Sequence, residues 1–179
     1  MNGIDRSFFF TLYNLSYHSR LFDSFITFFG EYFFYFILLI FVCFAYKNYK
    51  RKTQQLKLYG FALLSAIIAR FGIASIIRFF YHRPRPFLAL SLPHLISDNT
   101  YSFPSGHTIF MFSLATAVYY FNKKLAYFLY GSGLLIGFAR VAGGAHYPSD
   151  VVGGIILGVA TSVAIYALIK AYSPQKNIL

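Results

Sequence analysis

A polar motif opens a long apolar run at residues 104–120, which read PSGHTIFMFSLATAVYY. Pro104 suits the first turn of a helix, because the N–H that proline lacks would be unpaired there anyway. The backbone N–H groups of Ser105, Gly106 and His107 would then be free at the positive end of the helix dipole. Such a helix start is a ready anion site, although a Ser/Gly helix start with an interfacial histidine is the alternative for this motif alone.

The composition of the chain is that of an integral membrane protein. Of its 179 residues, 58% are hydrophobic, 22% are aromatic and only 12% are charged, which is too apolar for an ordinary soluble domain. The net charge of +11 does not indicate nucleic acid as a partner, because the basic residues lie between the apolar segments instead of forming one basic face. The single cysteine, Cys43, excludes an intrachain disulfide and a cysteine-rich metal site.

Five apolar windows approach the length of about 20 residues that a membrane-spanning helix needs. They predict an all-α fold, an integral membrane helical bundle with five transmembrane helices. The predicted spans are residues 23–46, 58–80, 105–122, 125–142 and 149–172. The aromatic stretch 7–17 is too short to cross a bilayer, so we predict an interfacial or re-entrant helix there, and the count becomes six only if it crosses.

One domain is expected at this length, since no internal repeat, low-complexity tract or long linker indicates a second. Residues 1–179 are therefore predicted to form a single membrane domain. Within it, residues 1–20 are the interfacial N-terminal segment and residues 78–150 carry the polar motifs.

The basic residues between the spans predict an orientation. Lysines and arginines cluster in the connector 47–57, at residues 123–124 and near the C-terminal end. If these clusters are cytoplasmic, as the positive-inside rule favours, alternation sends the connector 81–104 and the turn 143–148 to the outer face. Every polar motif then lies at that face.

A histidine and a carboxylate lie four residues apart where Pro148 opens the last apolar run. One imidazole nitrogen of His146 can then bond to Asp150, which fixes the tautomer and leaves the other nitrogen free to attack. Capping of the helix N-terminus is the alternative role for Asp150.

Three arginines, Arg78, Arg85 and Arg140, lie at or just beyond the ends of helices at the same predicted face. Each alone could simply anchor a helix end. Together, with no matching acids expected at this face, they indicate an anionic ligand, because guanidinium groups bind phosphate oxygens bidentately.

Other polar residues are weaker candidates for the site. Glu31 and Arg70 fall inside two predicted spans, where an ionisable group is costly, so they are expected either to pair with each other or to line the substrate cavity. Arg83 and His82 are weaker candidates for binding the anionic ligand than the three arginines. The residues expected to be loop residues in water are His18, His94 and Asp98.

The motifs Arg78-x6-Arg85-Pro86, Pro104-Ser105-Gly106-His107 and Arg140-x5-His146-x3-Asp150 resemble, in order and spacing, the three signature motifs of the type 2 phosphatidic acid phosphatase (PAP2) superfamily. The resemblance implies a PAP2-type core and a lipid phosphatase that needs no metal ion or other cofactor. Two positions depart from the family pattern, because Arg78 replaces the usual lysine and Ala139 the usual serine. Neither change removes a group that the mechanism requires.

The resemblance also implies roles for individual residues. His146 would be the nucleophile that forms a phosphohistidine, Asp150 its orienting partner, and His107 the general acid that protonates the leaving oxygen. The phosphate would be held by Arg78, Arg85, Arg140, Ser105 and the amide of Gly106.

Residues 14–18 and 23–32 are similar to the corresponding part of bacterial undecaprenyl-diphosphatases. This similarity implies undecaprenyl diphosphate as the substrate and the bacterial cytoplasmic membrane as the location, with the site facing the periplasm or the cell exterior. The motifs bind the phosphate and not its tail, so phosphatidate, phosphatidylglycerophosphate and lipid A phosphate stay open as alternatives.

Two other classes of protein are open to test. A lipid headgroup-binding or transport protein would need the arginines but not a nucleophile with its orienting acid, so His107, His146 and Asp150 count against it. A His/Asp metalloenzyme is disfavoured, because these three residues are the only obvious ligands and no HExxH-like spacing occurs.

Overall fold

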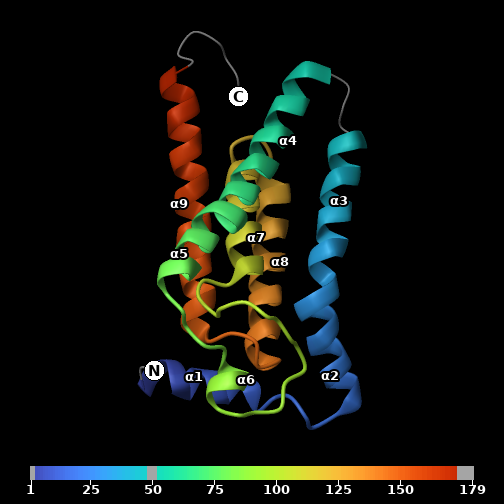
Figure 1. Ribbon diagram of the computed structural model, residues 1–179. Coiled ribbons are helices and arrows are strands. Elements are labelled where there is room, and N and C mark those ends of the chain that lie inside the picture. The colour runs from blue at the N-terminus through green and yellow to red at the C-terminus, as the bar shows by residue number, and fades with distance from the viewer. Residues whose placement is uncertain (1–2, 48–51, 173–179) are drawn as a thin grey trace.

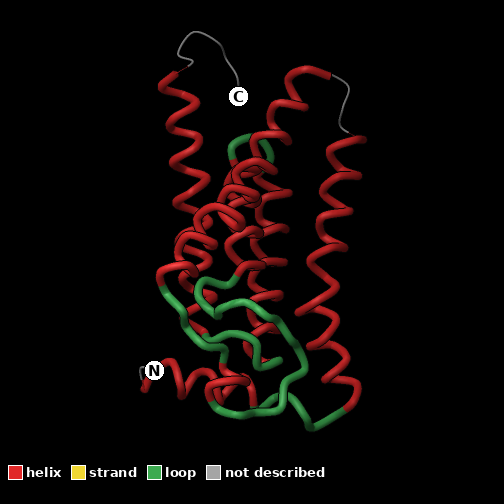
Figure 2. Tube along the Cα trace, viewed as in Figure 1, coloured by secondary structure: helices red, strands yellow, loops and turns green. Residues whose placement is uncertain are grey.

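The structure, a computed structural model, describes residues 3–47 and 52–172, and these ranges form helices and loops with no strand (Figures 1 and 2). The prediction of an all-α fold is confirmed. In chain order the elements are α1 (Gly3–Tyr13), α2 (Arg20–Thr27), the π-helix η1 (Phe28–Tyr32), α3 (Phe33–Lys47), α4 (Lys52–Ile67), the π-helix η2 (Ile68–Ile73), α5 (Ala74–Phe80), α6 (Pro86–Ala89), α7 (Gly106–Tyr119), α8 (Lys123–Ala142) and α9 (Pro148–Tyr172).

Four helices in the described ranges are long and apolar enough to cross a membrane. Two of them are continuous through a π-helical segment, so that α2, η1 and α3 form one helix, and α4, η2 and α5 form another. The four candidate spans are Arg20–Lys47, Leu56–Phe80, Lys123–Ala142 and Pro148–Ala171. They coincide with four of the five predicted spans.

The fifth predicted span, 105–122, is the shorter helix α7. Its 14 residues reach about 21 Å at 1.5 Å per residue, less than the roughly 30 Å of a bilayer core. Every residue from Gly106 to Val118 is buried. The helix therefore lies inside the bundle, enclosed by the longer helices, and its N-terminus is set back toward the interior.

Small residues allow α9 to approach α7 closely. A Cβ at Gly154 would lie 3.1 Å from the Ser105 carbonyl oxygen, and a Cβ at Gly158 would lie 2.5 Å from that of Ile109. Farther along the same face, the Ser162 hydroxyl donates to the Ser113 carbonyl at 2.7 Å. Close backbone contact through small residues, supplemented by an interhelical hydrogen bond, is the usual basis of helix packing in membranes.

Helix α1 lies across one end of the bundle instead of crossing with the others (Figure 1). Its buried residues Phe9 and Tyr13 pack against Val141 and Tyr147, while Phe8 is exposed. The observed helix begins four residues before the predicted stretch 7–17, and its 11 residues are too few to span a bilayer.

The polar motifs and the basic clusters lie at opposite ends of the bundle. Helices α7 and α9 begin at the end where α5 and α8 finish, and the loops there contain α6 (Figure 1). Lys123 opens the 20-residue helix α8 and Arg140 lies in its last turn, so about 25 Å of helix separates them. Likewise, Asp150 is in the first turn of α9 and Lys170 in its last.

Replacing Gly158 with alanine should destabilise the bundle. The new Cβ would lie 2.5 Å from the Ile109 oxygen and 3.0 Å from the Ser113 nitrogen, and both are backbone atoms of a buried helix. We expect a loss of about 1–3 kcal/mol in the free energy of unfolding, the usual cost of overpacking.

The matched control is Gly131→Ala, because a Cβ at Gly131 meets nothing within 4 Å. Thermal unfolding in detergent should show an unchanged or slightly raised midpoint for this variant, since alanine favours helix. Equal midpoints for the two variants would contradict the proposed α7–α9 contact.

Candidate active site

All eight residues that the motifs single out lie at one end of the bundle (Figure 1). They come from the end of α5, the start of α6, the start of α7, the last turn of α8, the loop after it and the first turn of α9. All except Arg78 are buried. The eight residues are Arg78, Arg85, Ser105, Gly106, His107, Arg140, His146 and Asp150.

The contacts of His146 determine its tautomer. Arg85 donates from Nη1 to His146 Nε2 at 3.1 Å, and a guanidinium group can only donate. Nε2 therefore carries the lone pair and Nδ1 the proton. Nδ1 faces the Asp150 Oδ2 atom at 3.5 Å, which is longer than a usual hydrogen bond.

The electrostatic surroundings keep His146 neutral. Burial lowers the pKa of its imidazole well below the ordinary 6.5, and the positive charges of Arg140 and Arg85 lower it further. A neutral imidazole at neutral pH retains a lone pair, which a nucleophile or base requires.

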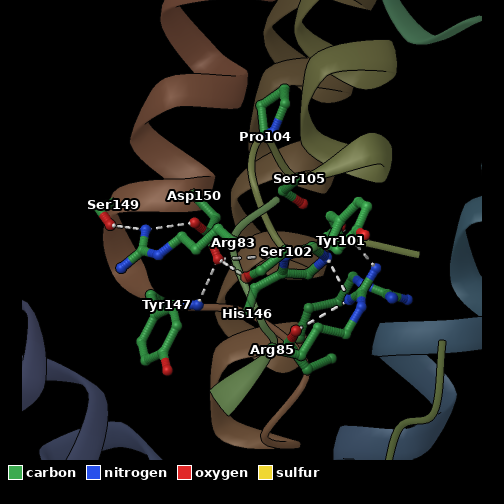
Figure 3. Close-up of polar contacts among 12 residues, drawn as sticks. Arg83, Arg85, Tyr101, Ser102, Pro104, Ser105, His146, Tyr147, Ser149 and Asp150 are labelled. Carbon is green, nitrogen blue, oxygen red and sulfur yellow. Dashed lines mark hydrogen bonds and ion pairs between the residues drawn. The ribbon is translucent and has the colours of Figure 1, made fainter. Parts of the chain in front are cut away.

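Asp150 is fully buried and each of its carboxylate oxygens is occupied (Figure 3). Oδ1 accepts from Arg83 Nη1 at 2.6 Å, and Oδ2 accepts from the Tyr147 N–H at 2.8 Å and from the Ser102 hydroxyl. Its backbone carbonyl accepts from the Ser105 N–H at 3.0 Å. One residue thus connects the start of α9 to the loop before α7.

Arg83, which the sequence indicated less strongly than Arg78, Arg85 and Arg140 as a site residue, lies in the site. Its Nη2 is 2.6 Å from Asp5 Oδ2, and its Nη1 also donates to the Ser149 hydroxyl at 2.7 Å. The guanidinium carbon lies 4.1 Å from the centroid of the Tyr147 ring. Arg83 therefore connects α1 to the first turn of α9 and holds Asp150 from the side away from His146.

The start of α7 differs in one respect from the expectation of three free N–H groups. The N–H of Ser105 is not free, because it donates to the Asp150 carbonyl at 3.0 Å. The Ser105 side chain instead accepts from the Thr108 hydroxyl at 3.0 Å. Gly106 and His107 begin the helix, and their N–H groups are the ones that an anion at this helix start can use.

Two guanidinium groups border Gly106. Arg78 donates from Nη2 to the Pro104 carbonyl at 2.7 Å. A Cβ at Gly106 would lie 3.2 Å from Arg78 Nη2 and 3.6 Å from the guanidinium carbon of Arg70, so glycine is the residue that allows both cations this close to the helix start.

The expected pairing of Glu31 with Arg70 is wrong. No ion pair joins them among the residues that the structure describes. The guanidinium carbon of Arg70 instead lies 5.5 Å from the ring centroid of Phe34, and its Nη1 is buried without a hydrogen-bond partner. The alternative, that a charged residue within a span borders the site, describes Arg70.

The site also contains the carboxylate of Asp98, which we predicted from the sequence to be a loop residue in water. Asp98 Oδ2 lies 2.8 Å from Arg85 Nη2 and 3.2 Å from Arg140 Nη2. The expectation of no acid opposite the arginines is therefore wrong. Burial acts to raise the pKa of Asp98, but Arg85, Thr100 and Arg140 together hold it below its ordinary value.

Arg85 and Arg140 are each fixed by backbone carbonyls as well. Arg85 Nε donates to the Thr100 carbonyl at 2.6 Å and Nη1 to that of Ala145 at 2.9 Å. Arg140 Nη1 donates to the carbonyl of Gly30, within the π-helix η1, at 3.0 Å. Their positions are thus set before any ligand binds, while the Nε atom of Arg140 is buried without a partner.

The charge of the site suits an anion. Four arginines, Arg70, Arg78, Arg85 and Arg140, surround the start of α7, and guanidinium groups are donors without an acceptor. Among the described residues, no group of three or more His, Cys, Asp or Glu side chains is placed to hold a metal ion.

Comparison with known proteins agrees with this geometry. The sequence profile of the PAP2 superfamily matches residues 55–173. The chain belongs to the PAP2 superfamily. Undecaprenyl-diphosphatase BcrC of Bacillus subtilis (strain 168) is 33% identical over 150 residues, which are 83% of this chain and 75% of that protein.

Two crystal structures share the fold. LpxE of Aquifex aeolicus superposes with a TM-score of 0.71 at 26% identity, over 93% of this chain and 96% of that one. The transmembrane PAP2 type phosphatidylglycerolphosphate phosphatase of Bacillus subtilis superposes with a TM-score of 0.67 at 19% identity, over 98% and 90%. This PAP2 protein is a membrane-embedded hydrolase of lipid phosphates or diphosphates.

Replacing Arg83 with glutamine should damage both stability and activity. The Asp150 carboxylate would stay buried without its cationic partner, and breaking a buried ion pair from one side costs about 3–5 kcal/mol. Because the Arg83 side chain is 14% exposed, we expect about 3 kcal/mol, measured by denaturant unfolding in detergent, and reduced phosphate release.

Arg20→Gln is the matched control, since Arg20 is an exposed arginine at the start of α2. This variant should unfold as the unchanged protein does. If Arg83→Gln also unfolded and hydrolysed substrate like the unchanged protein, Arg83 would not support Asp150.

Proposed function

We propose that this protein hydrolyses undecaprenyl diphosphate to undecaprenyl phosphate at the outer face of the bacterial cytoplasmic membrane, through a phosphohistidine at His146. The observation that carries the proposal is the lone pair on His146 Nε2, since Arg85 donates to this atom and Asp150 faces the protonated Nδ1. A site that only binds phosphate has no need of an oriented, neutral imidazole.

In the first step, Arg85 Nη1 transfers its hydrogen bond from His146 Nε2 to a phosphoryl oxygen, and the freed Nε2 attacks the terminal phosphorus of the lipid diphosphate. A nitrogen–phosphorus bond forms while the bond between this phosphorus and the bridging oxygen breaks. Asp150 stabilises the positive charge that develops on the imidazole. Burial and the neighbouring arginines lower the pKa of the His107 imidazole well below 6.5, so His107 takes up a proton when the anionic substrate binds beside it and gives this proton to the departing lipid phosphate.

In the second step, a water molecule attacks the phosphorus of the phosphohistidine. His107, now deprotonated, takes the proton from this water, the nitrogen–phosphorus bond breaks, and inorganic phosphate leaves. His146 returns to its neutral form and His107 to its protonated form, so the cycle closes without a cofactor.

The transferred phosphoryl group would be held by the arginines and the start of α7. Arg78, Arg85 and Arg140 are each placed by carbonyl contacts, so little reorganisation is needed when charge develops on the phosphoryl oxygens. The Gly106 amide completes the pocket, and Ser105 lies fully buried directly before it. Arg70 adds a fourth cation beside Gly106.

The basic clusters support the proposed orientation. Lysines mark the end of the bundle opposite the site, and the positive-inside rule favours that end for the cytoplasm. The site would then open to the periplasm or the cell exterior. The lipid tail is proposed from the 33% identity to an undecaprenyl-diphosphatase, because the described contacts involve the phosphate pocket alone.

The central test is phosphate release by purified protein in detergent, with a chelator present. Undecaprenyl diphosphate should be hydrolysed faster than phosphatidate, phosphatidylglycerophosphate or lipid A. His146→Ala should abolish release while the protein still unfolds in one cooperative transition, which shows that the fold is kept. A wild-type rate for His146→Ala would overturn the mechanism, and a faster rate on another lipid would replace the proposed substrate.

The pH profile tests the state of the nucleophile. The folded-state pKa of His146 lies well below 6.5, so the imidazole stays unprotonated as the pH falls through that value and gains a proton only at lower pH. The acid limb of kcat/KM that belongs to the enzyme should therefore lie below pH 6.5. Measuring the profile with two lipid substrates separates this limb from substrate ionisation, and a shared limb centred at or above 6.5 would contradict the assignment.

A further inference from the structure

The reactive groups are enclosed in this structure. His146 is 1% exposed, Arg85 0% and Arg140 2%. Two cavities border the site. One, of about 840 Å³, is lined by Arg78, Arg85 and Asp98, the other, of about 1100 Å³, by Arg83, Tyr147 and Ser149, and neither is lined by His146 or Arg140. The first borders two of the arginines proposed to bind phosphate, so a phosphate group that enters there meets Asp98 before it reaches the nucleophile.

Asp98 occupies the position between the two buried arginines. Its Oδ2 is shared by Arg85 Nη2, at 2.8 Å, and Arg140 Nη2, at 3.2 Å. Its electrostatic attraction also reaches Arg70 and Arg78. An anionic oxygen shared by guanidinium groups is the contact that a phosphate oxygen makes in such a pocket.

The segment that carries Asp98 is short and held at both ends. Before it, Ile96 is fully buried and its N–H donates to the Gly143 carbonyl at 3.3 Å. After it, the Ser102 N–H donates to the Arg83 carbonyl at 2.9 Å. Between these points, residues 97 and 99–101 are exposed, and the segment is held to the site by Asp98 and by Thr100, whose carbonyl accepts from Arg85 Nε at 2.6 Å. The Asp98 side chain can therefore turn away from the arginines without unfolding these anchors.

We infer that Asp98 is a tethered competitor of phosphate: its carboxylate occupies the phosphate position between Arg85 and Arg140, leaves when a phosphate group binds, and returns when the product departs. This inference rests on the proposed function, since it takes these arginines to be the phosphate site. It assigns to Asp98 a role in specificity and product release, and no covalent step.

The competitor discriminates between two sources of the same anion. A lipid phosphate is held at the membrane by its tail, so it reaches the pocket at a high effective concentration. Free inorganic phosphate has only its charge with which to displace Asp98. The carboxylate therefore disfavours binding of the inorganic phosphate product more than binding of the lipid substrate.

Binding of inorganic phosphate to the full-length protein in detergent tests this directly, because binding requires no catalysis. Thermal unfolding is followed while phosphate is titrated at constant ionic strength. Asp98→Asn should lower the dissociation constant for phosphate by about tenfold, the low end of what a charge-assisted hydrogen bond contributes. Asp98→Glu, which keeps the charge, should bind phosphate as weakly as the unchanged protein or nearly so.

Asp23→Asn is the matched control, since it removes one half-buried carboxylate at the same end of the bundle, and the partner of this carboxylate is the Tyr17 N–H and not an arginine. It should change the dissociation constant by less than about twofold, because Asp23 pairs with none of the described arginines of the site and its charge is partly screened by solvent and salt. If Asp98→Asn bound phosphate equally or more weakly than the unchanged protein, Asp98 would be a structural support and the inference would be overturned. If phosphate stabilised none of the proteins, the proposed phosphate site would fail as well.

Hydrogen exchange on the unchanged protein gives a second test that does not depend on a variant. Saturating phosphate should speed exchange at residues 97–101, because Asp98 loses its two arginine partners, and should leave exchange within α7 unchanged or slower. Slower exchange at residues 97–101 with phosphate would overturn the displacement of Asp98.

Discussion

The burial of the Asp150 carboxylate is the constraint on which the site depends. A buried charge is costly unless it is paired and hydrogen-bonded, and Arg83, Ser102 and the Tyr147 N–H meet this requirement together. Those partners come from the two ends of the connector 81–105 and from the turn before α9, and the Asp150 backbone carbonyl adds the start of α7 through Ser105. The need to satisfy one carboxylate thus fixes the relative positions of the loop 81–105, α7 and α9, and with them the orientation of His146.

The same constraint explains why α7 can be short. Its N-terminus does not need to reach the membrane surface, because the loops before α7 and α9 fold over it and supply the polar groups. Gly154 and Gly158 let α9 lie directly against α7 along this recessed position. The proposed phosphate site is therefore placed by backbone-to-backbone contact between helices, and the arginines from α5 and α8 are directed at a fixed point.

The helices and the motif residues could be predicted from the sequence, because apolar length, proline at helix starts and positive-inside clusters are local signals. The partners from irregular segments could not. Asp98 and Arg83 lie in a connector whose path no periodicity describes, and Asp5 belongs to a helix start whose docking on α9 is a long-range contact. The expected Glu31–Arg70 pair failed for a related reason: similar depth in two spans does not place two side chains on facing sides of their helices.

The π-helical segment η1 supplies a last consequence, which concerns the tolerance of this helix to insertion and deletion. A π-turn holds one residue more than an α-turn, so removing Glu31 would restore a regular helix and rotate everything before it by about 100° about the axis. Ile26 would turn away from its contact with Ile96 and Ala142, and the Gly30 carbonyl would no longer meet Arg140. The length of this segment is therefore as constrained as the identity of its residues.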